Sequence, residues 1–175
     1  MVKKNNTYQG GAEEFKGFIR LSSNENNYGP ANSVIKTIKK NINHSNIYPE
    51  INSQSLAKQI AVFNKIPNEN VIVGAGSDEI LQMIFHALTK PGDLVMHTKY
   101  SFAMYEISAT VQGATTLSVP VGKSLVVDFS AIQTALKTSP KTKVVFLCSP
   151  QNPTGSTLPF DKITSLAQNN QNSLI

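Results

Sequence analysis

Hydrophobic residues after position 70 alternate between short continuous runs and longer segments with helical spacing. The runs predict buried strands at 71–73, 94–96, 115–119 and 144–147. The spaced segments predict helices at 77–89, 103–112, 129–136 and about 159–167. Strands that alternate with helices are typical of right-handed crossovers. The pattern therefore predicts an α/β fold, with a mainly parallel sheet between two helical layers in a three-layer α/β/α arrangement.

The polar and apolar pattern differs in the first third of the chain. Residues 1–31 have little periodicity and predict an N-terminal arm, with a short strand at 18–21 as one interpretation. Amphipathic helices are predicted at 32–42 and 54–65. We therefore expect a boundary after residue 31, with 32–175 belonging to one α/β domain.

The helix predicted at 77–89 is apolar almost all round, so we expect it to be buried. The helix predicted at 129–136 follows Asp128, whose carboxylate is a good N-cap.

Composition narrows the class of protein. The 175 residues are 40% apolar and 15% charged, with a formal net charge of +5. The lysines are scattered and Arg20 is the only arginine, which argues against a nucleic-acid interface. The lysines near the start are followed by no apolar segment, and no run is long enough to cross a membrane. These features predict a cytoplasmic protein that does not bind membranes.

The single cysteine, Cys148, excludes an intrachain disulfide and reads as a small buried hydrophobe. The three histidines have no metal-ligand spacing among themselves or with this cysteine. We therefore expect no metal site.

The stretch 144–155 carries the first candidate for chemistry. An apolar run ends abruptly in Ser-Pro-Gln-Asn-Pro-Thr-Gly, where the prolines fix φ and Gly155 permits a positive φ. Asn152 would then lie at the carboxyl end of a buried strand, where ligands of open α/β sheets bind. Its amide would donate to a ligand oxygen, or equally well bond its own backbone in a plain turn.

The stretch 71–79 carries the second candidate. A predicted strand passes through Gly74-Ala75-Gly76 into a helix, whose free N–H groups would form an anion site with phosphate as the usual guest. A dinucleotide fingerprint would need glycine at position 79, which is Glu79. In the alternative interpretation, Asp78 and Glu79 only complement the helix dipole.

The third candidate is the aromatic segment 100–105, which follows a predicted strand. Its aromatic rings would pack in the core or lie flat on a planar ligand. Together, a phosphate cradle, an aromatic surface and a rigid amide at strand ends suggest a phosphorylated planar heterocycle.

With these motifs in this order, the sequence resembles the fold-type-I pyridoxal-phosphate aminotransferases, and among them the histidinol-phosphate aminotransferases. The resemblance rests on six segments that follow at family spacing. They are Tyr8-Gln9-x-Gly11, 21–30, Tyr48-Pro49, 74–79, 100–102 and 149–155.

The resemblance implies pyridoxal phosphate as the cofactor and a small amino-acid or amino-phosphate substrate. Gly76, Ser77 and Asp78 would hold the cofactor phosphate, Phe102 would stack on its ring and Asn152 would donate to its phenolic oxygen. Tyr48 would reach the phosphate in the neighbouring subunit of a homodimer. Tyr8 and Asn24 would help to bind the substrate.

The chain also departs from the family pattern. Asn27 replaces a proline in the 21–30 loop, which affects its rigidity, and Gln151 replaces a commoner asparagine, with little expected effect. The Schiff-base lysine, the aspartate opposite the pyridine nitrogen and the substrate-binding arginines lie further on in the family. We therefore expect the N-terminal part of a cofactor-binding large domain, with no catalytic residue of its own.

The resemblance implies transfer of an amino group between glutamate and imidazole-acetol phosphate, in histidine biosynthesis. An aromatic-amino-acid aminotransferase and a phosphothreonine-type decarboxylase would share these motifs. A non-catalytic phosphate-binding module is the alternative from another class.

Overall fold

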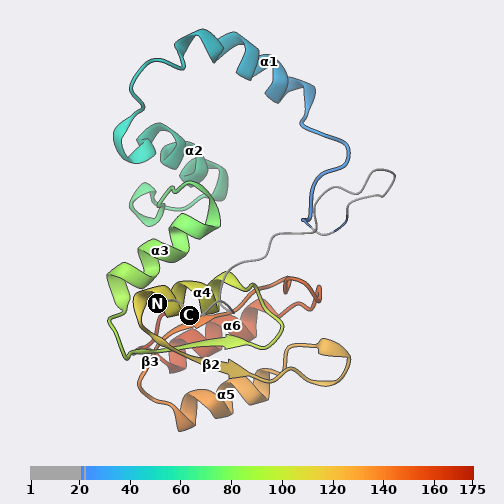
Figure 1. The fold of residues 1–175 in the computed structure, drawn as a ribbon, viewed down its shortest axis with the longest axis vertical. Coiled ribbons are helices and arrows are strands. Elements are labelled where there is room, and N and C mark those ends of the chain that lie inside the picture. Colours follow the sequence, from blue (N-terminus) through green and yellow to red (C-terminus); the bar gives the residue numbers. More distant parts are fainter. Residues whose placement is uncertain (1–20, 22) are drawn as a thin grey trace. The chain divides into compact units, whose positions relative to one another are not determined.

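The computed structural model describes Leu21 and residues 23–175 (Figure 1). The described residues form two compact units, which we call the N-terminal unit (21–73) and the sheet unit (74–175). The predicted boundary after residue 31 stays a prediction.

The sheet unit is built on three parallel strands, β1 (Leu94–Thr98), β2 (Thr115–Val119) and β3 (Thr142–Phe146), in the order β2-β1-β3. β1 is central, so Val95 to Thr98 are all buried. On the other side of β3, the Val145 N–H donates to the Leu174 carbonyl at 2.8 Å and the Leu174 N–H donates to the Lys143 carbonyl at 2.9 Å. Leu174 thus extends the parallel pairing by one position beyond β3.

Four helices cover the two faces of this sheet (Figure 1). They are α3 (Gly76–Leu88), α4 (Met104–Gln112), α5 (Phe129–Thr138) and α6 (Phe160–Asn169). Alternate strand residues point to opposite faces: Val95 packs with residues of α3 and α4, whereas Met96 packs with residues of α5 and α6. The predicted three-layer α/β/α architecture is confirmed.

Helix ends in the sheet unit follow local sequence rules. The Asp128 carboxylate accepts hydrogen bonds from the Ser130 and Ala131 N–H groups at 3.0 and 3.1 Å, so the predicted cap of α5 is confirmed. Hydrogen bonds from the Ser130 side chain and the Ala131 backbone hold the pKa of Asp128 below its ordinary value. Gly113 ends α4 with φ +75°, a conformation that favours glycine.

The N-terminal unit contains two longer helices, α1 (Asn32–Asn41) and α2 (Gln54–Asn64), both close to their predicted ranges. Short 3₁₀ turns lie at Ile42–His44, Ile51–Ser53 and Asn68–Asn70, and a fourth lies at Lys123–Leu125 in the sheet unit. α1 buries no residue, and α2 buries Ala57 and Ala61.

Two sequence-based expectations about the strands and helices were wrong. Residues 71–73 form no strand, and Ile72 is 75% exposed. α3 is not buried all round, because only Leu81 and Phe85 are buried while Met83 and Leu88 are exposed. An apolar run acquires strand structure or burial only where a neighbouring element covers it. The strand predicted at 18–21 lies outside the described residues except for Leu21, which is exposed.

We expect the 175-residue chain, purified alone, to self-associate at micromolar concentration. Past Leu174, the outer side of β3 has no further strand partner in the described part of the chain. Apolar side chains of α1, Val34 and Ile38 among them, are also exposed. Sedimentation velocity is the measurement, and a single monomeric species with a cooperative melt would contradict this expectation.

Candidate active site

Asn152 lies in a tight loop that follows β3. The Gln151 N–H donates to the Ser156 carbonyl at 2.7 Å, and the Gly155 N–H donates to the Gln151 carbonyl at 2.7 Å. Gly155 has φ +73°, a conformation that glycine permits. The Ser149–Pro150 and Asn152–Pro153 peptide bonds are both cis.

The side-chain amide of Asn152 makes no hydrogen bond to any described residue, although its backbone N–H donates to Cys148 Sγ at 3.4 Å. The plain-turn interpretation, in which this amide bonds its own backbone, is therefore not what the structure shows. The side chain is half-buried, so its donor and acceptor remain available to a ligand.

Gln151 is a buried, fully bonded residue to which sequence reasoning gave no role. It is 2% exposed, and its side chain crosses from the β3 loop to the β1 loop. Its Oε1 accepts from Thr98 Oγ1 at 3.0 Å, and its Nε2 donates to the carbonyls of Lys99 and Tyr100 at 3.2 and 3.3 Å. The only sequence signal was its position beside Asn152.

Phe102 follows β1, the strand next to β3 in the sheet. It packs against the cluster formed with α3 and α4 and meets the Tyr105 ring edge-on at a centroid distance of 5.8 Å. Tyr105 in turn stacks on Phe146, with centroids 4.5 Å apart. The aromatic contacts therefore hold Phe102 at the carboxyl end of the sheet.

Two buried polar atoms in β1 and the loop that follows it have no hydrogen-bond partner among the described residues. They are His97 Nε2 and Ser101 Oγ. The other ring nitrogen of His97 lies 3.0 Å from the Thr98 carbonyl, a geometry in which Nδ1 would be the donor.

Cys148 differs from its expected place, because β3 ends at Phe146 and the cysteine is only half-buried in the following turn. Its thiol donates to the Pro150 carbonyl at 3.2 Å. The expectation of a buried apolar cysteine was wrong, since the run of apolar letters continues past the last residue of the strand.

Burial of the Tyr105 hydroxyl, with the neighbouring Cys148 acting in the same direction, raises the pKa of Tyr105 to about 12. An unfolded chain has an ordinary tyrosine pKa near 10. At pH values between about 10 and 12, the folded chain therefore still holds the hydroxyl proton that the unfolded chain has lost. Unfolding free energy should fall as pH rises from about 10 to 12, by roughly 1–2 kcal/mol for this partly exposed ring. Denaturant titrations should show a shallower fall for Tyr105→Phe, whereas Tyr28→Phe, at a fully exposed position, should match the parent.

The start of α3 bears on both interpretations of its glycine turn. The Ala75 N–H donates to the Glu79 carboxylate, which therefore acts on the helix end as the dipole interpretation predicted. Gly76 has φ +81°, and the backbone N–H groups of Ser77 and Asp78 have no hydrogen-bond partner among the described residues. These exposed N–H groups at a helix N-terminus can donate hydrogen bonds to an anion.

The structure brings together two of the three candidate segments. Gln151 joins the loop of Phe102 to the loop of Asn152, whereas no hydrogen bond of the described residues joins either loop to Ser77 or Asp78. The strand expected before α3 is absent, so only two of the segments follow strand ends.

The remaining predicted residues lie elsewhere in the chain. Tyr48 and Asn24 belong to the N-terminal unit, where Tyr48 is 85% exposed and Asn24 has φ 52°. Tyr8 lies outside the described residues.

The loop 24–29 is ordered by Asn26, a motif residue to which the resemblance assigned no role. Asn26 Oδ1 accepts from the Tyr28 N–H at 3.1 Å, and its Nδ2 donates to the Gly29 carbonyl at 2.9 Å. These two bonds hold the turn in which Asn27 replaces the family's proline.

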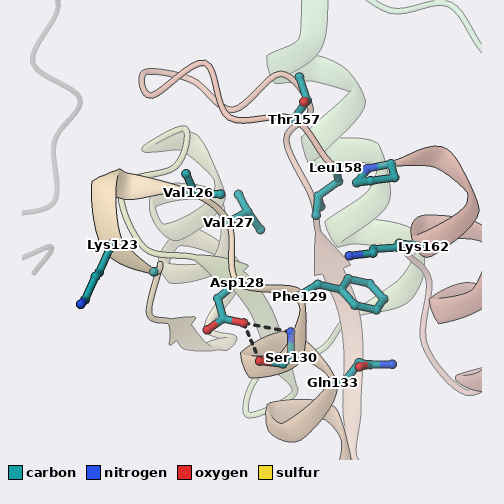
Figure 2. Close-up of a pocket in the computed structure, with 12 residues that line it drawn as sticks. Lys123, Val126, Val127, Asp128, Phe129, Ser130, Gln133, Thr157, Leu158 and Lys162 are labelled. Atoms are coloured by element: carbon teal, nitrogen blue, oxygen red, sulfur yellow. Dashed lines mark hydrogen bonds between the residues drawn. The ribbon is translucent and has the colours of Figure 1, made fainter.

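A pocket of about 530 Å³ lies where the start of α5 faces residues 157–159 (Figure 2). None of the predicted cofactor-binding residues lines it. Asp128 already accepts from the N–H groups at the start of α5, and Lys162 Nζ lies 5.6 Å from the Phe129 ring centroid. The Asp128 carboxylate therefore already occupies the helix N-terminus that α5 brings to this pocket.

Across Leu21 and residues 23–175, no cluster of histidine, cysteine and acidic side chains has the geometry of a metal site. No helix in this part of the chain has the length and apolar character needed to cross a membrane.

Comparison with known proteins gives consistent results. The chain is 39% identical over 163 residues to histidinol-phosphate aminotransferase of Ruegeria pomeroyi. This match covers 91% of this chain and 44% of that protein. It is 35% identical to an aromatic amino acid aminotransferase of Cutibacterium acnes, over 89% of this chain and 44% of that protein. The chain thus spans less than half the length of these relatives.

Among solved structures, the fold matches histidinol-phosphate aminotransferase of Sinorhizobium meliloti, solved in complex with pyridoxal-5'-phosphate, with a TM-score of 0.77. The two sequences are 23% identical, and the match covers 83% of this chain and 39% of the other. Residues 16–175 match the sequence profile of the class I and II aminotransferases. The chain therefore belongs to the class I and II aminotransferase family.

Proposed function

We propose that these residues are the N-terminal part of a histidinol-phosphate aminotransferase. The complete polypeptide would transfer an amino group from histidinol phosphate to 2-oxoglutarate, giving imidazole-acetol phosphate and glutamate. The observation that carries this proposal is the 39% identity to a histidinol-phosphate aminotransferase along 91% of the chain.

The donors left without partners support pyridoxal phosphate as the cofactor. The N–H groups of Ser77 and Asp78, reached through the turn at Gly76, would bind its phosphate. Phe102 would contact its ring, and the unpartnered amide of Asn152 would donate to its ring oxygen. When bound, the cofactor supplies the electron sink for transamination.

Other parts of the proposal rest on residues outside the sheet unit. Tyr48, with its exposed ring, would reach the cofactor phosphate of a second subunit, which makes the complete protein a homodimer. Tyr8 and Asn24 would bind the substrate. A cytoplasmic location, with neither nucleic acid nor membrane as partner, completes the proposal.

An aromatic amino acid aminotransferase is the second candidate, because a relative of that name is 35% identical over 89% of the chain. Both activities would use the same cofactor residues, so substrate preference separates them.

The test is a steady-state assay of the complete polypeptide with histidinol phosphate and with phenylalanine, each with 2-oxoglutarate. We expect kcat/KM for histidinol phosphate to exceed that for phenylalanine at least about tenfold, a difference of about 1.4 kcal/mol in transition-state binding. The reverse preference would support the second candidate, and turnover of neither substrate would contradict both.

A further inference from the structure

Gln151 is a buried polar residue that connects two loops of the candidate site. Its side-chain amide reaches from the loop after β3 to the end of β1, across 53 residues of sequence, through the bond with Thr98. The Nε2 bonds to the Lys99 and Tyr100 carbonyls lie three and two residues before Phe102. The side chain is thus anchored to the segment that carries the aromatic ring.

The backbone of the same residue closes the loop that carries Asn152. Its N–H and carbonyl bond to Ser156 and Gly155, so Asn152 is the first residue inside a closed turn. Gln151 is therefore bonded through its backbone to the turn that carries Asn152, and through its side chain to the segment that leads to Phe102.

The chemistry of these contacts requires a neutral primary amide. The hydroxyl of Thr98 needs an acceptor, whereas the carbonyls of Lys99 and Tyr100 need donors. A carboxylate would offer no donor and would repel the two carbonyl oxygens, and an apolar side chain would leave the buried Thr98 hydroxyl without this partner.

We propose that Gln151 is a positioning residue, which sets the separation and relative orientation of Phe102 and Asn152. It does not itself contact the cofactor, and it acts by holding the two loops in one arrangement before the cofactor binds. This proposal rests on the proposed function, since it assigns cofactor contacts to those two residues. A preorganised pair binds a rigid planar ligand more tightly, because less ordering remains to be done on binding.

The test compares the complete polypeptide with its Gln151→Met variant. Methionine has nearly the same length and removes all three side-chain bonds, while both backbone bonds of the loop remain. We expect the dissociation constant for pyridoxal phosphate, measured by titration, to rise at least about tenfold. The visible circular dichroism of the bound cofactor should also weaken, since its ring is held less firmly. Gln168→Met, at an exposed position of α6, should match the parent in both measurements.

Thr98→Val provides a second, milder variant, because it removes one bond of Gln151 and keeps the buried side chain's shape. We expect a smaller loss of affinity than for Gln151→Met. The double variant should lose no more than Gln151→Met alone, because the bond between the two residues is already broken. If Gln151→Met does not fold, the Thr98→Val loss of affinity carries the test, and parental affinity would overturn the proposal.

Hydrogen exchange of the cofactor-free protein separates this proposal from the proposed function. Gln151→Met should speed amide exchange in both segments 99–102 and 152–156 at least about tenfold, with no change for Gln168→Met. Failure of the parent to bind pyridoxal phosphate would contradict the proposed function, while unchanged exchange in Gln151→Met would overturn the role of Gln151. Cofactor binding within twofold of the parent in Gln151→Met would also overturn it.

Discussion

Asn152→Ala in the complete polypeptide is expected to lower kcat/KM roughly 30- to 1,000-fold, equivalent to about 2–4 kcal/mol of transition-state stabilisation. The reason is that the amide of Asn152 is a donor held in a closed turn, with no hydrogen-bond partner of its own among the described residues. The measurements are steady-state kinetics with the preferred substrate and the absorbance maximum of the bound cofactor, which should shift.

Asn169→Ala is the matched control, because this asparagine is exposed and its amide bonds only within α6. It should leave both the kinetics and the spectrum at parental values. If Asn152→Ala kept the parental turnover and absorbance, Asn152 would not belong to the site.

The 175-residue chain by itself is expected to show no transamination above background. A lysine that bonds the cofactor must be made neutral by desolvation or by nearby cations. Every lysine in the described part of the chain is exposed instead. Lys99, the one nearest a strand end, has its Nζ 5.1 Å from the centroid of the Tyr100 ring.

The measurement is reduction of a mixture of the chain and pyridoxal phosphate with borohydride, followed by mapping of the modified lysines. We expect sub-stoichiometric labelling spread over several lysines. The complete polypeptide, treated in parallel, should label at one position. Stoichiometric labelling of one lysine in the 175-residue chain, with glutamate-dependent turnover, would contradict this expectation and the absence of a catalytic residue.

Local sequence rules predicted those parts of the structure that depend on local interactions. The Asp128 cap involves atoms only a few residues apart, so the sequence alone carries enough information to predict it. The strand and helix order of the sheet unit followed from hydrophobic periodicity for the same reason.

The errors arose where distant partners decide the outcome. Residues 71–73 have the composition of a buried strand, but strand structure requires a paired neighbour. In the sequence, Gln151 is only a minor departure from a motif. Its hydrogen-bond partners lie about fifty residues earlier in the chain, and no local sequence pattern predicts them. Asn152 was singled out from its place in a proline-rich turn after a strand, and Phe102 through resemblance, whereas the side chain that joins their loops became visible only in the structure.

The long separation between Thr98 and Gln151 also bears on the order in which the chain acquires structure. Closing a contact across 53 residues costs more chain entropy than forming a helix turn, so helices such as α4 and α5 can form first. The bonds of Gln151 require β3 to be already aligned beside β1. During synthesis, therefore, the paired loops are assembled only after the ribosome has released β3 and the turn that follows it. We therefore expect the candidate site to be completed late in folding, after β1 and β3 have paired.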